Sequence, residues 1–230
     1  MKSLVIKNLN YRYPDGTDAL REAALAIERG SRLALLGGNG SGKTTLLLHI
    51  AGLLDGDGFI EVMGVERSKK TIEEIRRRVG LLFSQVEYQF IMPDLLNDIM
   101  LSLSPFPLSV EEKREQALQW LRRFNLEQYQ YKSPLDLSSG EMKRAALAAI
   151  VSRGPDILLL DEPLNNLDKR NSMIIIDLLR SFESSMIIAT HRRIIVEELA
   201  THIAVMEDGR ITGMYENNEK PLSSFETLLF

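Results

Sequence analysis

Residues 37–45, with the sequence GGNGSGKTT, constrain this chain more than any other stretch. An apolar run at residues 33–36 precedes them, and a helix-like stretch at residues 46–54 follows. The glycine spacing ahead of Lys43 and Thr44 matches a phosphate-binding loop, in the strand–loop–helix context that this motif requires. A chance match has a probability of roughly 1% in a chain of this length. The segment therefore predicts a binding site for a nucleoside triphosphate.

Each residue type in this loop has a chemical reason. Glycines let successive backbone N–H groups point inward, and these groups form an anion site at the N-terminus of a helix. Lys43 is placed to reach the β- and γ-phosphates, and the Thr44 hydroxyl is placed to ligate Mg²⁺. We expect the nucleotide to contact Gly37, Gly38, Asn39, Gly40, Ser41, Gly42, Lys43, Thr44 and Thr45.

Composition narrows the class of protein. The 230 residues fit one large α/β domain, or a core with a helical insertion. A formal net charge of −4 argues against nucleic acid as the partner. The absence of cysteine excludes disulfides, thiolate zinc sites and cysteine nucleophiles, and it suits a cytoplasmic protein. No apolar stretch is long enough to span a bilayer, so any membrane contact is expected to run through a partner.

Strand and helix patterns alternate along most of the chain. Strands are predicted over residues 4–9, 24–28, 33–36, 59–63, 79–83, 156–160, 185–189, 203–207 and 210–215. Helices are predicted over residues 46–54, 71–78, 169–182 and 194–200. This alternation predicts a parallel sheet with crossover helices, and the continuous apolar run at residues 79–83 suits its centre.

The pattern changes between Ser84 and Pro134, where strand signals stop. Helices are predicted there over residues 95–103, 110–124 and 127–131. Trp120, Leu121 and Phe124 recur at helical spacing, which favours a hydrophobic core over a ligand site. We therefore predict an inserted helical subdomain.

Two carboxylates end the apolar run at residues 157–160. Ligands of open α/β sheets bind at the carboxyl ends of strands. Asp161 is therefore placed to hold Mg²⁺, and Glu162 to deprotonate a water for in-line attack on the γ-phosphate. His191 follows the predicted strand at residues 186–189 and faces the same edge, where it is placed to donate to the γ-phosphate. An ordinary acidic strand end is the alternative, which the phosphate loop disfavours.

A second anion-binding arrangement occurs at residues 137–144, with the sequence LSSGEMKR. Ser138, Ser139 and Gly140 precede a helix predicted at residues 145–152, and the start of a helix attracts anions. Taken alone, this is a capped helix. Two phosphate-binding elements and one acidic pair are unusual for a simple kinase or GTPase.

Together these motifs resemble those of ATP-binding cassette (ABC) ATPases. Residues 137–141 are similar to the signature motif of that family, residues 37–45 to its Walker A loop and residues 157–162 to its Walker B strand. Leu167 and Asp168 resemble the D-loop, which implies that Asp168 contributes to nucleotide binding.

The resemblance covers residues 4–207 and implies the fold. The fold class is α/β, with a P-loop NTPase parallel-sheet core, an N-terminal antiparallel β subdomain and an inserted α-helical subdomain. Residues 1–230 are expected to form a single ABC ATPase domain. Residues 1–83 and 156–230 form its core with the β subdomain, and residues 84–155 form the helical subdomain.

The resemblance also implies roles for single residues. From local sequence Tyr13 is better explained as a strand tyrosine packing a hairpin, whereas the family pattern implies that it stacks on adenine. His191 resembles the switch histidine. Two cassettes, each with ATP and Mg²⁺, are expected to pair head to tail, so that Ser139 and Gly140 act on the γ-phosphate of the partner's nucleotide. Ser138 is also expected to contribute to nucleotide binding.

Two positions depart from the family pattern. The usual Gly-Gly-Gln of the signature is Ser139-Gly140-Glu141. The glutamine of the Q-loop falls at Ser84, and Gln85 follows one place later. We predict that Gln85, with Ser84 as the alternative, contacts Mg²⁺ and contributes to catalysis.

Residues 11–16 and 89–93 are most similar to the energy-coupling factor group, whose ATPases power uptake of cobalt, nickel or vitamins. The resemblance implies a peripheral protein on the cytoplasmic face of the membrane. Its expected partners are a second ABC ATPase subunit, identical or different, and integral membrane subunits that dock in part on residues 90–103. The alternatives are another class of ABC transporter, a cytosolic ABC ATPase outside transport, a phosphoryl-transferring kinase and a non-hydrolysing regulatory subunit.

Overall fold

The computed structural model describes residues 1–219 and 222–229, and these form two compact units. The sheet unit comprises Met1–Leu81, Asp156–Glu162 and the described part of residues 182–230. The helical unit comprises Leu82–Pro155 and Pro163–Ser181. The sequence patterns group residues 163–181 with the sheet, whereas in the structure they cluster with the helices.

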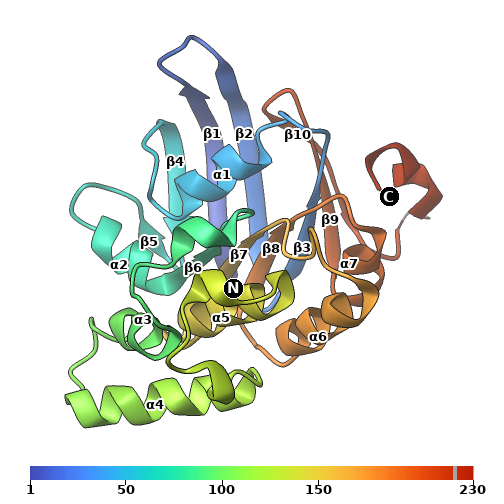
Figure 1. Ribbon diagram of the computed structural model, residues 1–230. Coiled ribbons are helices and arrows are strands. Elements are labelled where there is room, and N and C mark those ends of the chain that lie inside the picture. The colour runs from blue at the N-terminus through green and yellow to red at the C-terminus, as the bar shows by residue number, and fades with distance from the viewer. Residues whose placement is uncertain (220–221, 230) are drawn as a thin grey trace. The chain divides into compact units, whose positions relative to one another are not determined.

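The first sheet of the sheet unit is antiparallel, with the strand order β2-β1-β4-β5 (Figure 1). Its strands are β1 (Lys2–Arg12), β2 (Asp18–Glu28), β4 (Asp57–Val62) and β5 (Val65–Glu66). β1 and β2 are longer than their alternating patterns predict. The reason is that register shifts interrupt the pairing of these two strands, and a bulge breaks the period-2 alternation without ending the strand.

The second sheet has the order β10-β9-β3-β8-β7-β6. Its strands are β3 (Arg32–Leu36), β6 (Val79–Leu82), β7 (Ile157–Asp161), β8 (Ser185–Ala189), β9 (His202–Glu207) and β10 (Arg210–Glu216). β3 pairs in parallel with β8 and β9, and β7 with β8, as predicted. The prediction that residues 79–83 lie at the sheet centre is wrong, because β6 is an edge strand. An apolar run indicates that both faces are covered, and it carries no information on lateral neighbours.

Helix α1 (Lys43–Ile50) packs in the core of the sheet unit. Its Leu46, Leu47 and Ile50 belong to one hydrophobic cluster with residues of both sheets. The helix begins three residues before the predicted start at Leu46, inside the motif at residues 37–45. Lys43 and Thr44 therefore stand on its first turn. The unit also contains α2 (Ile72–Arg78), α7 (Arg193–Glu198) and the 3-10 helix η4 (Leu222–Leu228).

Four helices, α3, α4, α5 and α6, pack against one another in the helical unit (Figure 1). They are α3 (Leu95–Ser102), α4 (Val110–Arg123), α5 (Ser139–Val151) and α6 (Lys169–Arg180), with short 3-10 turns η1 (Val86–Gln89), η2 (Glu127–Tyr129) and η3 (Pro134–Asp136). Leu121 and Phe124 are fully buried, as predicted. Trp120 is only half-buried, with the Arg123 guanidinium 5.1 Å from its ring centroid. Among the described residues, no helix has the length and apolarity needed to cross a membrane.

His49 is a fully buried histidine in α1. Its Nδ1 lies 2.8 Å from the Thr45 carbonyl oxygen, so Nδ1–H donates to it. Nε2 is buried without a hydrogen-bond partner among the described residues and faces Gly56, where a Cβ would lie 2.9 Å away. A proton on Nε2 would have no acceptor, and burial accordingly lowers the pKa of His49.

The lowered pKa of His49 predicts that acid destabilises the fold. Between the folded pKa and the unfolded pKa of about 6.5, only the unfolded chain binds this proton. The contribution of His49 to stability is therefore complete above that pH and falls below it, by up to about 1.4 kcal/mol per pH unit. Urea unfolding of the wild type, His49→Asn and the control His202→Asn between pH 7.5 and 5.5 measures it. An unchanged pH slope in His49→Asn would contradict the assignment.

Candidate functional site

Neighbouring residues of the sheet unit hold the phosphate loop in place. Gly42 has φ +104°, and a Cβ there would lie 2.5 Å from the Ala19 carbonyl oxygen, so only glycine fits. The Gly209 N–H, in the β9–β10 turn, donates to the Ser41 carbonyl oxygen over 3.0 Å. In contrast, the space beside Gly38 and Gly40 is open. The loop backbone is thus fixed where it contacts Ala19 and Gly209, and it is open beside Gly38 and Gly40.

Lys43 extends over the loop that precedes it. Its Nζ donates to the carbonyl oxygens of Gly37 and Gly38 over 2.7 and 3.0 Å. Burial lowers the pKa of Lys43, and the charges of Glu162 and Asp161 oppose this shift. The Ser41 hydroxyl is also buried, and it has no hydrogen-bond partner in the described part of the chain. A cation and an available hydroxyl at one loop fit the oxygens of a triphosphate.

The two predicted magnesium ligands of the sheet unit lie together. Thr44, on the first turn of α1, donates its hydroxyl to Oδ2 of Asp161, at the end of β7, over 2.8 Å. Two hard oxygen donors fit Mg²⁺, which usually takes one or two protein ligands and completes its shell with phosphate and water. The third predicted ligand, Gln85, belongs to the helical unit.

Glu162 and His191 form a direct contact that the sequence does not predict. His191 Nδ1 lies 2.7 Å from Glu162 Oε1, and both side chains are largely buried. The Glu162 N–H also donates to the Ala189 carbonyl oxygen over 2.9 Å, which joins the ends of β7 and β8. Glu162 has φ +47°, a strained conformation that is common at active sites. The carboxylate is therefore held in one orientation by an imidazole, as a general base requires.

Tyr13 lies at the tip of the β1–β2 hairpin and is half-buried. Its hydroxyl is 3.1 Å from Oγ1 of Thr45, and its ring meets that of Tyr11 edge-on, with 4.9 Å between centroids. These contacts hold Tyr13 beside the helix that begins at the phosphate loop. An aromatic ring at this place is suited to stack on a nucleotide base.

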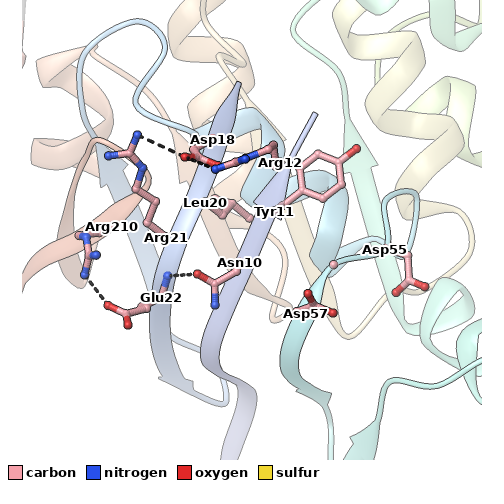
Figure 2. Close-up of a pocket in the computed structure, with 11 residues that line it drawn as sticks. Asn10, Tyr11, Arg12, Asp18, Leu20, Arg21, Glu22, Asp55, Asp57 and Arg210 are labelled. Carbon is pink, nitrogen blue, oxygen red and sulfur yellow. Dashed lines mark hydrogen bonds and ion pairs between the residues drawn. The ribbon is translucent and has the colours of Figure 1, made fainter. Parts of the chain in front are cut away.

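Paired charges brace the same hairpin around a shallow pocket (Figure 2). Arg12 donates to both carboxylate oxygens of Asp18, over 2.5 and 3.0 Å, and these two residues pair across β1 and β2. Arg210 of β10 donates to Glu22 of β2 over 2.6 Å. These two ion pairs connect β1, β2 and β10 around the pocket.

In the helical unit, α5 begins at Ser139, six residues before the predicted start. Ser138 and Glu141 form a capping box: the Ser138 N–H donates to Glu141 Oε2 over 2.9 Å, and the Glu141 N–H donates to Ser138 Oγ over 3.4 Å. The hydrogen bond from the Ser138 hydroxyl lowers the pKa of Glu141. Glutamate in place of glutamine at 141 thus retains a function as a cap, with Ser139 and Gly140 on the first turn.

The remaining predicted residues also lie in the helical unit. Asp168 is the N-cap of α6 and accepts the Asn171 N–H over 2.7 Å. Ser84 and Gln85 are exposed at the segment that leads into η1. Gln89, which the sequence patterns miss, accepts the Phe83 N–H over 3.2 Å at the end of β6. The role of Gln85 at the nucleotide remains a prediction.

Comparison with known proteins gives a consistent family. A family model described as ABC transporter matches residues 20–165. An ABC transporter ATP-binding protein of Gloeobacter violaceus, provisionally so named, is 40% identical over 216 residues, 93% of this chain and 88% of that protein. The energy-coupling factor transporter ATP-binding protein EcfA of Methanosphaera stadtmanae is 36% identical over 214 residues, 90% of this chain and 77% of EcfA.

Solved structures agree with these relatives. The structure of cbiO1 from Clostridium perfringens, part of the ABC transporter complex cbiONQ, has a TM-score of 0.83 at 30% identity, with 98% of this chain and 92% of cbiO1 covered. The ATP-binding cassette MJ0796, dimeric in a post-hydrolysis state with ADP and Pi, has a TM-score of 0.84 at 26% identity, with 94% of this chain and all of that chain covered. The predicted α/β fold class is confirmed by these matches.

Proposed function

Since the chain belongs to the ABC transporter family, as an ATP-binding and ATP-hydrolysing subunit, we propose that it powers an importer of the energy-coupling factor type. The observation that carries this subclass is the likeness to EcfA and to cbiO1, each along nearly all of this chain. Cobalt, nickel or a vitamin is the proposed cargo. The protein is proposed to work as a peripheral subunit on the cytoplasmic face of the membrane.

The proposed mechanism uses the residues of the sheet unit in sequence. Lys43 and the loop backbone around Gly38 and Gly40 bind the β- and γ-phosphates, and Tyr13 orients the base. Thr44 and Asp161 would hold Mg²⁺, which neutralises phosphate charge when bound. Glu162, held by His191 at 2.7 Å, accepts a proton from the water that attacks the γ-phosphate.

Pairing of two subunits completes the proposed site. The capped first turn of α5 presents the N–H groups of Ser139 and Gly140, and a helix N-terminus favours an anion. We propose that it meets the γ-phosphate bound by a second ABC ATPase subunit, with Asp168 close by. Support comes from MJ0796, whose post-hydrolysis structure with ADP and Pi is dimeric.

Ser139→Arg tests this pairing. The arginine side chain would fill the space that the partner's phosphate needs, while the phosphate loop of the same subunit is unchanged. We expect ATP binding by the monomer within about twofold of wild type and loss of ATP-induced dimers, as seen by size exclusion with light scattering. Arg170→Ala, an exposed change nearby, is the control. Normal dimers of Ser139→Arg would contradict the head-to-tail arrangement.

Reconstitution tests the transport role. The protein is co-expressed with the transmembrane subunits of an energy-coupling factor importer from the same genome, purified as a complex and placed in vesicles. We expect ATPase activity to rise on assembly, and mass spectrometry of the complex to identify bound metal or vitamin. Activity that never responds to any membrane subunit would favour a cytosolic ABC ATPase instead.

A further inference from the structure

Lys143 is a buried lysine near the start of α5 that none of the roles above uses. The residue is 4% exposed, and its Nζ donates to the Asn165 carbonyl oxygen over 2.7 Å. Burying an ammonium group is costly unless it makes strong hydrogen bonds. The hydrogen bond to Asn165 therefore indicates a structural role for this lysine.

The acceptor belongs to the pre-α6 loop, which we define as residues 165–168, the end of a turn and the two residues before α6. This loop is outside regular structure, and Asn166 has φ +61°. Carbonyl groups in such a loop depend on side chains or water for donors. Lys143 supplies one donor, and the Ser139 hydroxyl supplies the next, to the Asn166 carbonyl oxygen over 3.2 Å.

A third contact, made by packing, joins the start of α5 to the first turn of α6. A Cβ on Gly140 would lie 2.6 Å from Oδ1 of Asn171, so glycine at position 140 leaves room for this side chain of α6. The Asn171 amide in turn donates to Oδ2 of Asp168 over 3.1 Å. All three contacts lie within the helical unit, and each connects the start of α5 to the pre-α6 loop or to the first turn of α6.

We propose that Lys143 is a positioning residue that makes the signature segment, residues 137–141, and the pre-α6 loop one rigid body. The functional consequence rests on the proposed function, in which both segments approach the nucleotide of the partner subunit. Loss of the Lys143 donor leaves ATP binding by the monomer intact. It lets the pre-α6 loop move independently of α5, which weakens ATP-driven pairing.

A spin label tests the rigid connection without any nucleotide. The chain has no cysteine, so Arg170→Cys, exposed on the first turn of α6, gives a single labelling site. We expect the nitroxide spectrum of the full chain to shift to a more mobile form in Lys143→Met. Ser139→Ala, which removes the second donor, should shift it in the same direction. The exposed change Lys132→Met is the matched control and should leave the spectrum as in wild type.

Pairing is then measured in a Glu162→Gln background with ATP. We expect Lys143→Met to raise the dimer dissociation constant about tenfold, the value of one net hydrogen bond, with monomer ATP affinity unchanged. Unchanged label mobility in both Lys143→Met and Ser139→Ala would overturn the proposal, as would wild-type pairing in Lys143→Met. If Glu162→Gln itself never pairs with ATP, the proposed function fails, and the label spectra still decide whether Lys143 holds the loop.

Discussion

Replacing Glu162 by glutamine should nearly abolish ATP hydrolysis while leaving ATP binding intact. The amide keeps the size of the side chain and accepts no proton, so the attacking water loses its base. Loss of general base catalysis lowers kcat by a factor on the order of 10²–10⁴. Because the phosphate loop and Lys43 are unchanged, calorimetry should give an ATP affinity close to that of wild type. ATP-bound dimers should accumulate, since hydrolysis no longer separates them.

The exposed change Glu183→Gln is the matched control and should hydrolyse ATP at the wild-type rate. A change at His191 distinguishes the contribution of the base from that of the residue that holds it, since His191 Nδ1 lies 2.7 Å from Glu162 Oε1. His191→Ala should lower kcat less than Glu162→Gln, because the carboxylate remains, while its orientation and the predicted donor to the γ-phosphate are lost. Hydrolysis near the wild-type rate in Glu162→Gln would remove Glu162 from the base role.

Short-range motifs were predictable because their chemistry is local in the chain. The phosphate loop depends on residues within nine positions, 37–45, and the flanking strand and helix confirm its context. The acidic end of β7 is likewise local, because a single strand carries both the apolar run and the acidic residue at its end. For such segments the sequence carries both the backbone geometry and the functional groups.

Contacts between distant segments were not predictable. The pair Glu162 and His191 is separated by 29 positions, and only the parallel pairing of β7 with β8 brings the two strand ends together. The same reason hides Arg67, whose guanidinium donates to the His49 and Leu54 carbonyl oxygens at the end of α1. Nothing in its local sequence distinguishes it from a surface arginine.

Element boundaries failed where polar residues carry the start of a helix. Both α1 and α5 begin inside the motifs that are predicted to bind phosphate, at Lys43 and Ser139, because the motif residues are themselves the first turn. Hydrophobic periodicity begins only later, and it therefore predicts a late start. These early starts matter for function, since they place N–H groups of a helix N-terminus at the predicted anion sites.

Lys43→Ala should weaken ATP binding strongly. Lys43 is the only cation of the phosphate loop, and a hydrogen bond to a charged group contributes about 1.5–3 kcal/mol, or roughly 10- to 150-fold in affinity. The loop would also lose the donor that its Gly37 and Gly38 carbonyls share at 2.7 and 3.0 Å. Lys43→Met, which keeps most of the side-chain volume, separates lost charge from lost packing, and thermal unfolding reports whether either variant is misfolded.

The pH dependence of binding provides an independent check on the same residue. Burial lowers the pKa of Lys43, so the ammonium loses its proton at a lower pH than an ordinary lysine does. ATP affinity should be complete at neutral pH and fall on the alkaline side, beginning below the usual pKa of about 10.4. This fall in ATP affinity should vanish in Lys43→Met, which binds ATP more weakly and has no ammonium group to deprotonate. Equal affinities of wild type and Lys43→Ala in calorimetry at pH 7 would mean that the triphosphate binds elsewhere.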